Sequence, residues 1–330
     1  MERSLTPKFS FIIPTVANRE NLLELISTLK NANLKDFEII VVMQISTKNN
    51  TQIRTKLEKF TDIILIKLTG VDSVPMKRNL GFKRSRGDIL CFIDDDVTID
   101  VSLINFLKNS SILEGIIYFP EIMNSYYLPF PLGDHVGGKS YVSACFIINS
   151  KDFSKIGGMN DLLLTYRDDT EFFIRSVRKG MHLNFLDDAF VIHPVRRTNF
   201  NTMRSFFRKS ELEPLFHKLT KGCHYGLLGG RQISFTPNRY GFSILTYFLV
   251  LVLIISVALF FLSPTLLIIL LLTYSLFSLI PSSLYMIYPD MFLESENRRK
   301  FASVSIYMML LVILIPARLI GSLKYKHFTL

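Results

Sequence analysis

Three adjacent aspartates, Asp94-Asp95-Asp96, follow the apolar run Ile89–Ile93. Neighbouring carboxylates repel one another, so at the end of a buried strand they require a cation or many hydrogen bonds. Mg²⁺ or Mn²⁺, bound by one or two carboxylates and by phosphate oxygens of a substrate, would meet this requirement. Such an ion would act as a Lewis acid on a departing diphosphate. The alternative is a solvated acidic turn that caps the next helix, and both interpretations stay open at this point.

A second acidic pair, Asp168-Asp169, stands at the start of a predicted helix over Asp169–Lys179. Carboxylates are favoured at this end of a helix because they accept hydrogen bonds from its exposed amides. Alternatively, one of the two is a general base that takes the proton from an attacking hydroxyl. The two roles are compatible.

Two other features could contribute to a site. Lys77 and Arg78 begin a predicted helix over Lys77–Ser85 and could face phosphates, although such residues are usually solvated. His193 lies in the apolar run Phe190–Val195, where it is either a metal ligand or a core residue with a satisfied hydrogen bond. The sequence contains no P-loop, GxGxxG, GxSxG or paired CxxC motif.

Short apolar strands alternate with helical stretches in the first hundred residues. The predicted strands are Phe9–Ile13, Phe37–Met43, Ile63–Leu68 and Ile89–Ile93, with a helix from a cap at Asn18 to Asn31, another ending near Phe60, and a break at Gly87. This alternation predicts an α/β, Rossmann-type, mainly parallel sheet with flanking helices. Further along, Tyr141–Asn149 is a predicted strand and Gly157-Gly158 a turn. Ligands of such sheets bind beyond the carboxyl ends of the strands, where Pro14-Thr15, Met43-Gln44 and the three aspartates fall.

The composition divides the chain into two parts. The 330 residues are 49% hydrophobic, and the mean hydropathy of +0.30 is too high for an ordinary soluble enzyme. Residues 241–289 contain no Asp, Glu, Lys or Arg. We predict a cytoplasmic domain over 1–231 and a membrane region over 232–330, with helices near 242–262, 265–288 and 301–323. The third helix either spans the bilayer, enters it and returns to the same side, or lies in its interface.

Charge and cysteine content narrow the class of protein further. The segment 175–231 carries eleven Lys and Arg against four Asp and Glu, as expected of a cytoplasmic face beside anionic headgroups. Because this charge adjoins the membrane region and no nucleic-acid-binding module is present, a nucleic-acid partner is disfavoured. Three scattered cysteines exclude a disulfide-stapled module, and the apolar content excludes disorder. The apolar run near the N-terminus is too short for a signal peptide.

Four pieces of the chain together resemble glycosyltransferase family 2. They are FSFIIPTVANRENLLELI, VPMKRNLGFKRSRGDILCFIDDDV, FSKIGGMNDLLLTYRDDTEFFIR and the late His193, which occur in the family's order over roughly residues 8–215. The resemblance implies a GT-A fold and an inverting enzyme that uses nucleotide-diphosphate sugars. It also implies a substrate-binding set: Pro14, Thr15, Arg19, Gln44, Arg78, Asp94, Asp95 and Asp168.

The same resemblance implies the chemical roles of the acidic residues. Asp94 and Asp96 would form a DxD pair that binds Mg²⁺ or Mn²⁺, with Asp96 as the favoured ligand and His193 completing the site. Asp169, the second acid of the family's Glu-Asp motif, would be the catalytic base. Asp168 stands where the family has Glu. Met43-Gln44 replaces the usual acidic residue after the second strand, which leaves uridine specificity open, with Gln44 as a substitute.

We therefore predict a multi-pass membrane protein whose cytoplasmic domain is an inverting glycosyltransferase. It would move one sugar from a nucleotide-diphosphate sugar to a hydroxyl or phosphate of a polyprenyl- or lipid-linked acceptor in cell-surface glycan synthesis. The basic segment would hold the acceptor's phosphate beside membrane lipids, and the absence of a QxxRW motif favours transfer of a single sugar. The alternative is a non-catalytic nucleotide-sugar-binding or scaffold protein of a glycan assembly complex, which Met43-Gln44 favours.

Overall fold

The structure is a computed structural model that describes the chain in two compact units. The described residues are 7–45, 51–109, 111–123, 141–164, 166–193, 210–220, 223–225, 235–237 and 316–327, with isolated positions between 255 and 272. The first unit comprises Met1–Ser125, Val136–Val195 and Tyr225–Ser234; the second comprises Tyr126–His135, Arg196–His224 and Phe235–Leu330.

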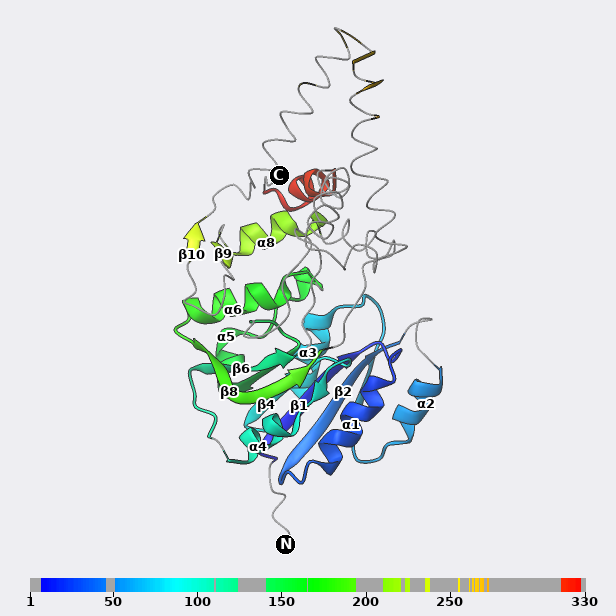
Figure 1. The fold of residues 1–330 in the computed structure, drawn as a ribbon, viewed down its shortest axis with the longest axis vertical. Coiled ribbons are helices and arrows are strands. Elements are labelled where there is room, and N and C mark those ends of the chain that lie inside the picture. Colours follow the sequence, from blue (N-terminus) through cyan, green and yellow to red (C-terminus); the bar gives the residue numbers. More distant parts are fainter. Residues whose placement is uncertain are drawn as a thin grey trace. The chain divides into compact units, whose positions relative to one another are not determined.

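An eight-stranded sheet, in the order β3-β2-β1-β4-β7-β6-β8-β5, is the centre of the first unit (Figure 1). Its strands are β1 Phe9–Thr15, β2 Phe37–Gln44, β3 Ile64–Leu68, β4 Ile89–Ile93, β5 Thr98–Ile99, β6 Ile116–Met123, β7 Cys145–Asn149 and β8 His182–Ile192. Strands β3, β2, β1 and β4 are parallel, as predicted. Strand β7 runs antiparallel to β4 and β6, and β5 antiparallel to β8, so the later half of the sheet is mixed rather than mainly parallel.

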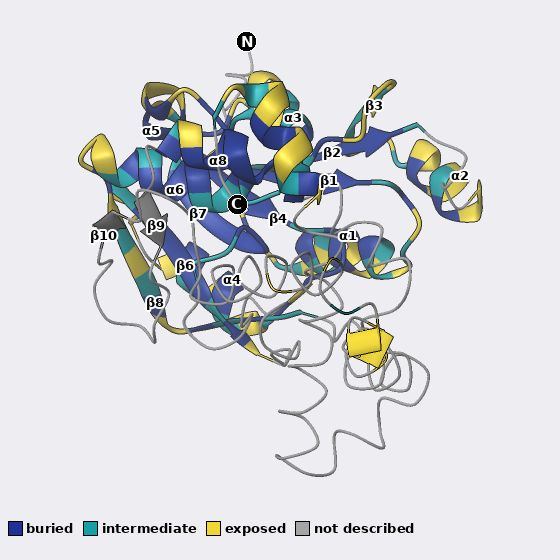
Figure 2. Cartoon of the chain, turned by 90° about the horizontal axis from the view of Figure 1, so that it is seen from above, coloured by how far each residue is buried: buried dark blue, intermediate teal, exposed yellow. Residues whose placement is uncertain are grey.

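Helices cover both faces of this sheet. They are α1 Asn21–Asn31, α2 Thr51–Lys59, α3 Val74–Arg84, α4 Val101–Asn109, α5 Ser150–Ile156 and α6 Asp168–Arg178, with a 3-10 turn η1 at Asp161–Leu163. Apolar residues of α1, α2 and α4 pack in one core, and those of α3, α5 and α6 pack in the other. Figure 2 shows the buried strands between helices whose outer faces are exposed.

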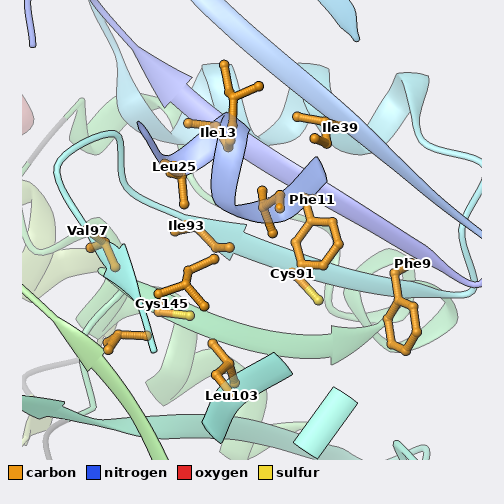
Figure 3. Packing of buried hydrophobic residues seen from close by; sticks show 14 of the residues in the cluster. Phe9, Phe11, Ile13, Leu25, Ile39, Cys91, Ile93, Val97, Leu103 and Cys145 are labelled. Atoms are coloured by element: carbon orange, nitrogen blue, oxygen red, sulfur yellow. The ribbon is translucent and has the colours of Figure 1, made fainter. Parts of the chain in front are cut away.

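The alternation of side chains along each strand supplies both cores. In β1, Phe9, Phe11 and Ile13 belong to one core and Ile12 to the other, because successive side chains point to opposite faces. Figure 3 shows Phe11 beside Cys91 of β4, which belongs to the same core. This two-sided burial explains why the strands read as continuous apolar runs.

Two glycines of the αβ connection lie against β1. A Cβ at Gly81 in α3 would clash with the Ile12 side chain, so glycine lets α3 lie close to the sheet. A Cβ at Gly87 would lie 2.8 Å from the backbone carbon of Phe9. The prediction that Gly87 ends the helix was wrong, because α3 already ends at Arg84 with Ser85 as an extended C-cap. Gly87 instead permits a close approach of two backbones.

The predicted cap at Asn18 was also wrong. Helix α1 begins at Asn21 with Glu20 at its N-cap, and no side chain caps it. The hydrophobic spacing located the helix, since Leu22, Leu25 and Leu29 are buried, but it did not locate the first turn.

The described part of the second unit contains few elements. They are α8 Glu213–Thr220, a two-stranded sheet of β9 Cys223–Tyr225 and β10 Phe235–Pro237, and a helix over 316–325. Apart from isolated positions, the predicted membrane helices 242–262 and 265–288, and 301–315 of the third, lie outside the described residues. Among the residues that can be described, no helix has both the length and the apolar content to cross a bilayer. The division into a domain over 1–231 and a membrane region over 232–330 stays a prediction.

Candidate active site

The three aspartates directly follow β4, at the carboxyl edge of the parallel strands. The Thr15 hydroxyl at the end of β1 donates a hydrogen bond to Asp95 Oδ2 (2.6 Å). The Arg19 guanidinium donates to Asp95 Oδ1 (2.7 Å) and lies 2.5 Å from Asp96 Oδ2. Asp95 and Asp96 are 6% and 2% exposed, so this turn is not a solvated one.

Arg78 makes hydrogen bonds to three separate segments of the site. Although 1% exposed, its guanidinium donates to Asp94 Oδ1 (2.7 Å), to the carbonyl of Ser143 (2.9 Å) and to Asp168 Oδ2 (3.3 Å). One side chain of α3 therefore joins the end of β4, the segment before β7 and the start of α6. A buried arginine with several charged and carbonyl acceptors holds them in fixed positions, since breaking such pairs leaves buried charges uncompensated.

Asp169 is oriented by a different set of donors. Its Oδ2 accepts hydrogen bonds from the Ser143 amide (3.2 Å) and hydroxyl (3.4 Å), and its Oδ1 accepts from the Thr170 amide (2.7 Å). The N-cap of α6 is Arg167, in a left-handed conformation, so neither aspartate is the N-cap residue. Asp168 points to Arg78 and Asp169 to Ser143.

Burial changes the proton affinity of the acids. It is the main cause that raises the pKa of Asp168 to about 7; the adjacent Asp169 adds to the rise and Arg78 opposes it. Burial also raises the pKa of Asp94 to about 6, against the lowering effect of Arg78. The Asp94 side chain is 30% exposed and that of Asp168 only 9%, so burial acts more strongly on Asp168.

Negative charge exceeds positive charge in the described part of this site. Its carboxylates are Asp94, Asp95, Asp96, Asp168 and Asp169, and its guanidinium groups are Arg19 and Arg78. Lys77 is also buried, but its ammonium group pairs with Asp72 (2.7 Å) and donates to the carbonyl of Thr15 (3.3 Å). The excess of acid makes this edge of the sheet suitable for a cation.

The other predicted residues are placed differently. His193 Nε2 lies 3.8 Å from Asp96 Oδ1, so His193 faces the aspartates instead of being enclosed in the core. Pro14 is buried within β1, one residue before Thr15. Gln44 is buried at the end of β2, and its amide donates to the carbonyl of Gly70 (3.0 Å). The structure therefore brings His193 to the acidic cluster, whereas Gln44 binds a different loop.

Asp96 and His193 are the side chains that would fit a divalent ion. No group of three His, Cys, Asp or Glu side chains within the described ranges is arranged to hold a metal. A hard cation at a phosphate site needs only one or two carboxylates, since substrate oxygens and water complete its coordination. The buried Asp96 carboxylate, with the His193 imidazole beside it, is compatible with that smaller ligand set.

Sequence reasoning missed two residues, Ser143 and Asn79. Asn79 accepts a hydrogen bond from the Met159 amide (2.9 Å) and donates to the Met159 carbonyl (2.8 Å) and to Asp161 Oδ1 (2.7 Å). It thereby holds the loop before α6, where Gly158 has φ +70° and a Cβ would lie 2.7 Å from Asn79 Oδ1. Ser143 carried no sequence signal, and Asn79 only its place beside Arg78.

A cavity of about 500 Å³ lies next to this loop. It is lined by α3, by the turn at Gly157-Gly158 and by η1, and it shares Asn79, Gly158, Met159 and Asp161 with the contacts described above. None of the five aspartates lines it. The cavity therefore does not mark the acidic cluster.

Comparison with known proteins defines the class. Residues 10–108 match the family model described as glycosyl transferase family 2. The mannosyltransferase PcManGT from Pyrobaculum calidifontis, solved with GDP-Man and Mn²⁺, has a TM-score of 0.54 at 11% identity over 96% of this chain and 88% of that one. S. aureus TarS 1-349 has a TM-score of 0.45 at 17% identity, over 63% of this chain and 65% of that one. No curated protein matches.

The parallel strands with acids at their carboxyl edge and the PcManGT likeness define a GT-A fold. The family model adds a narrower likeness: residues 10–108, about a third of the chain, are similar to glycosyl transferase family 2. The chain matches just under two thirds of the TarS 1-349 fragment and 39% of the longer TarS chain.

Proposed function

We propose that this chain is an inverting glycosyltransferase that transfers one sugar from a nucleotide-diphosphate sugar. The observation that carries the proposal is the gathering of five acidic side chains at the edge of the sheet, three of them buried: Asp95, Asp96 and Asp168. One group, Asp94 to Asp96, follows β4, while Asp169 is held separately by Ser143. A donor diphosphate with its cation suits the first group, and an acceptor hydroxyl suits the second.

The proposed reaction needs one base. The acceptor oxygen attacks the anomeric carbon, the bond from that carbon to the donor phosphate oxygen breaks, and the electron pair leaves with the nucleotide diphosphate. Asp169 receives the proton of an attacking hydroxyl; an attacking phosphate would need no base. Hydrogen bonds from the Ser143 and Thr170 amides hold the Asp169 carboxylate in a fixed orientation for this role.

The donor side would be completed by Mg²⁺ or Mn²⁺ at Asp96, with His193 and Asp94 beside it. When bound, the ion would offset the charge of the departing diphosphate. Thr15 and Arg19 fix the aspartate turn, and Arg78 fixes Asp94 relative to α6. The PcManGT structure, which contains GDP-Man and Mn²⁺, supports a nucleotide sugar as donor. Gln44 stays our proposed substitute for the acid that usually holds the nucleoside.

The acceptor would be a polyprenyl- or lipid-linked molecule, used by a membrane-bound enzyme with a cytoplasmic active site in cell-surface glycan synthesis. The uncharged stretch 241–289 and the basic segment 175–231 support this. Two basic residues of that segment do not support it. Arg175 pairs with Glu171 (2.7 Å), and Lys179 donates to the carbonyl of Ile156 (3.1 Å). The acceptor's phosphate would therefore contact other residues of the segment.

One observation favours the non-catalytic alternative. Arg19 already contacts Asp95 and Asp96, and Arg78 contacts Asp94, so each acid of the turn has a partner without a metal ion. A protein of this kind would bind a nucleotide sugar without turnover. Protection from thermal unfolding by a nucleotide diphosphate, with no product formed, would support it.

The deciding experiment is a donor screen with the full chain in membranes. Radiolabelled nucleotide sugars are incubated with a lipid extract and Mn²⁺ or with a chelator, and products are identified by mass. We expect transfer with one donor, lost in Asp169→Asn and Asp96→Asn and retained in Asp62→Asn. Asp62 is a matched control because it is a 59% exposed acid that pairs with Lys30. Transfer that survives both active-site substitutions would refute the assignment.

A further inference from the structure

The helix over 316–325, in the second unit, buries its small residues and exposes its large apolar residues, which is the opposite of an ordinary surface helix. Its small residues are buried: Ala317 is 0% exposed, Ser322 is 7% exposed, and Gly321 is also buried. Its large apolar residues Leu319, Ile320 and Leu323 are 41%, 48% and 83% exposed. A helix on a water-soluble protein normally buries its apolar side and exposes its polar side. Here the large apolar side chains face away from the protein.

Contacts within the second unit fix this orientation. A Cβ at Gly321 would clash with the carbonyl oxygen of Glu211 and would lie 2.9 Å from its carbonyl carbon, so the two backbones are in direct contact. Lys324 Nζ donates to Glu211 Oε1 (2.7 Å), and Lys218 Nζ donates to the carbonyl of Tyr325 (3.0 Å). A rotation that buried Leu323 would break all three contacts. Close packing through small residues is typical of helices whose other sides face lipid.

The charged residues of the segment 316–327 itself are all positive. Residues 316–327 contain Arg318, Lys324 and Lys326 and no Asp or Glu. Lys324 pairs with Glu211, whereas Lys326 is exposed. A helix with apolar residues on one side and basic residues flanking them binds anionic lipid surfaces through both. If this side of the helix faced water, its large apolar side chains would stay exposed to solvent without any favourable contact.

Other described positions of the second unit show the same outward placement. These exposed apolar residues are Ile255, Phe261, Leu266, Ile268, Ile269 and Leu272. Large apolar side chains exposed in this number mark a surface that meets an apolar partner. The positive charge of residues 316–327 favours an anionic lipid surface over a protein as that partner.

We propose that the helix over 316–325 lies in the plane of an anionic membrane surface, with Leu319, Ile320 and Leu323 among the acyl chains and Arg318 and Lys326 at the headgroups. Of the arrangements predicted for 301–323, this selects the interfacial one for its last part. The inference does not depend on the proposed transferase activity, because it concerns only the second unit and its lipid contacts.

The test places a fluorescent probe on single cysteines of the full chain in lipid vesicles. Cys223→Ser removes one native thiol, and Cys91 and Cys145 are buried and so protected from the label. The probe, a nitrobenzoxadiazole, is attached at Leu319→Cys or Leu323→Cys. Leu113→Cys is the matched control, since Leu113 is a 56% exposed leucine of the first unit. Vesicles of phosphatidylcholine are compared with an equal mixture of phosphatidylcholine and phosphatidylglycerol, each with nitroxide lipids.

We expect nitroxides high on the acyl chain to quench both helix probes at the same depth, more strongly in the anionic vesicles, and to leave the Leu113 probe unquenched. Lys326→Gln should lower the ratio of docked to free helix about fivefold in anionic vesicles. Helix probes that behave like the Leu113 probe would overturn the proposal. Quenching of equal strength with and without phosphatidylglycerol would also overturn it. So would probe depths that differ by about 6 Å, because that is the axial distance between positions 319 and 323 in a helix that spans the bilayer.

Discussion

Large apolar side chains are buried in the cores of the first unit, whereas several of them are exposed in the helix over 316–325 of the second unit. In the first unit apolar residues fill two cores, and the charged residues Lys77, Arg78 and Asp96 are buried among their own partners. In the second unit Leu319 and Leu323 are exposed while Gly321 contacts the backbone of Glu211. The first unit therefore excludes water from its cores, whereas the helix over 316–325 in the second unit presents its large apolar side chains outward, even though Leu215 and Phe216 of α8 in the same unit are buried.

The largest difference should come from one substitution made in both units. Leu107 of α4 is 1% exposed, and Leu107→Gln would lose apolar burial and enclose an amide without a partner. We expect a loss of about 4 kcal/mol in the free energy of unfolding. Leu323→Gln should change it by less than about 0.5 kcal/mol in detergent. Urea unfolding of the full chain, followed by circular dichroism, measures both. Equal losses would show that Leu323 belongs to a core.

Arg78→Met tests whether the buried charges of the first unit stabilise it as a connected set. The methionine keeps much of the volume but leaves Asp94 and Asp168 without their shared partner, which should cost about 3 kcal/mol at neutral pH. The loss should be smaller near pH 5, where both carboxyl groups can be protonated. Urea titrations at the two pH values measure this, with Lys83→Met, an exposed residue of the same helix, as control. A loss that is independent of pH would point to packing alone.

Those parts of the first unit that depend on residues close together in the sequence could be predicted from it. Continuous apolar runs located β1, β2 and β4, because strands buried on both sides need no polar positions. The two acidic groups were found from residue type, since carboxylates at the start of a helix or the end of a buried strand are unusual enough to notice. The reversal of strand direction at β7 was missed because it depends on pairing between distant segments.

The same reason explains which site residues were missed. Ser143 is 26 residues from Asp169, and Asn79 is 80 residues from Met159, so neither contact is visible in a local pattern. Serine and asparagine are also common in loops and carry no chemical signature of their own. Arg78 was predicted to bind substrate, and the structure adds its contacts with Asp94 and Asp168. The role of Gly81 in packing α3 against Ile12 was equally hidden.

Asp168 should give the first unit a pH dependence of stability. Its pKa is about 7 in the native protein and 3.8 in a model carboxyl, so between these values the native state holds a proton that the unfolded state has lost. Stability contributed by this group therefore falls as pH rises through that window. Between about pH 5 and pH 7.5 the wild type should lose about 2 kcal/mol more than Asp168→Asn. Parallel stability curves for the two proteins would contradict the raised pKa.

The smallest expected effect concerns the orientation of the base by Ser143. Ser143→Ala removes the hydroxyl that donates to Asp169 Oδ2 (3.4 Å) but keeps the backbone amide that donates to the same oxygen (3.2 Å). Because one of two donors remains, we expect kcat to fall about fivefold, equivalent to about 1 kcal/mol, with the donor KM unchanged. Ser154→Ala in α5 is the control for loss of a serine hydroxyl. A raised donor KM would place Ser143 at the nucleotide sugar, whereas an unchanged kcat would mean that the amide alone orients Asp169. The effect should be the same in detergent and in vesicles, because Ser143 belongs to the water-excluding unit, and this distinguishes it from changes made in the helix over 316–325.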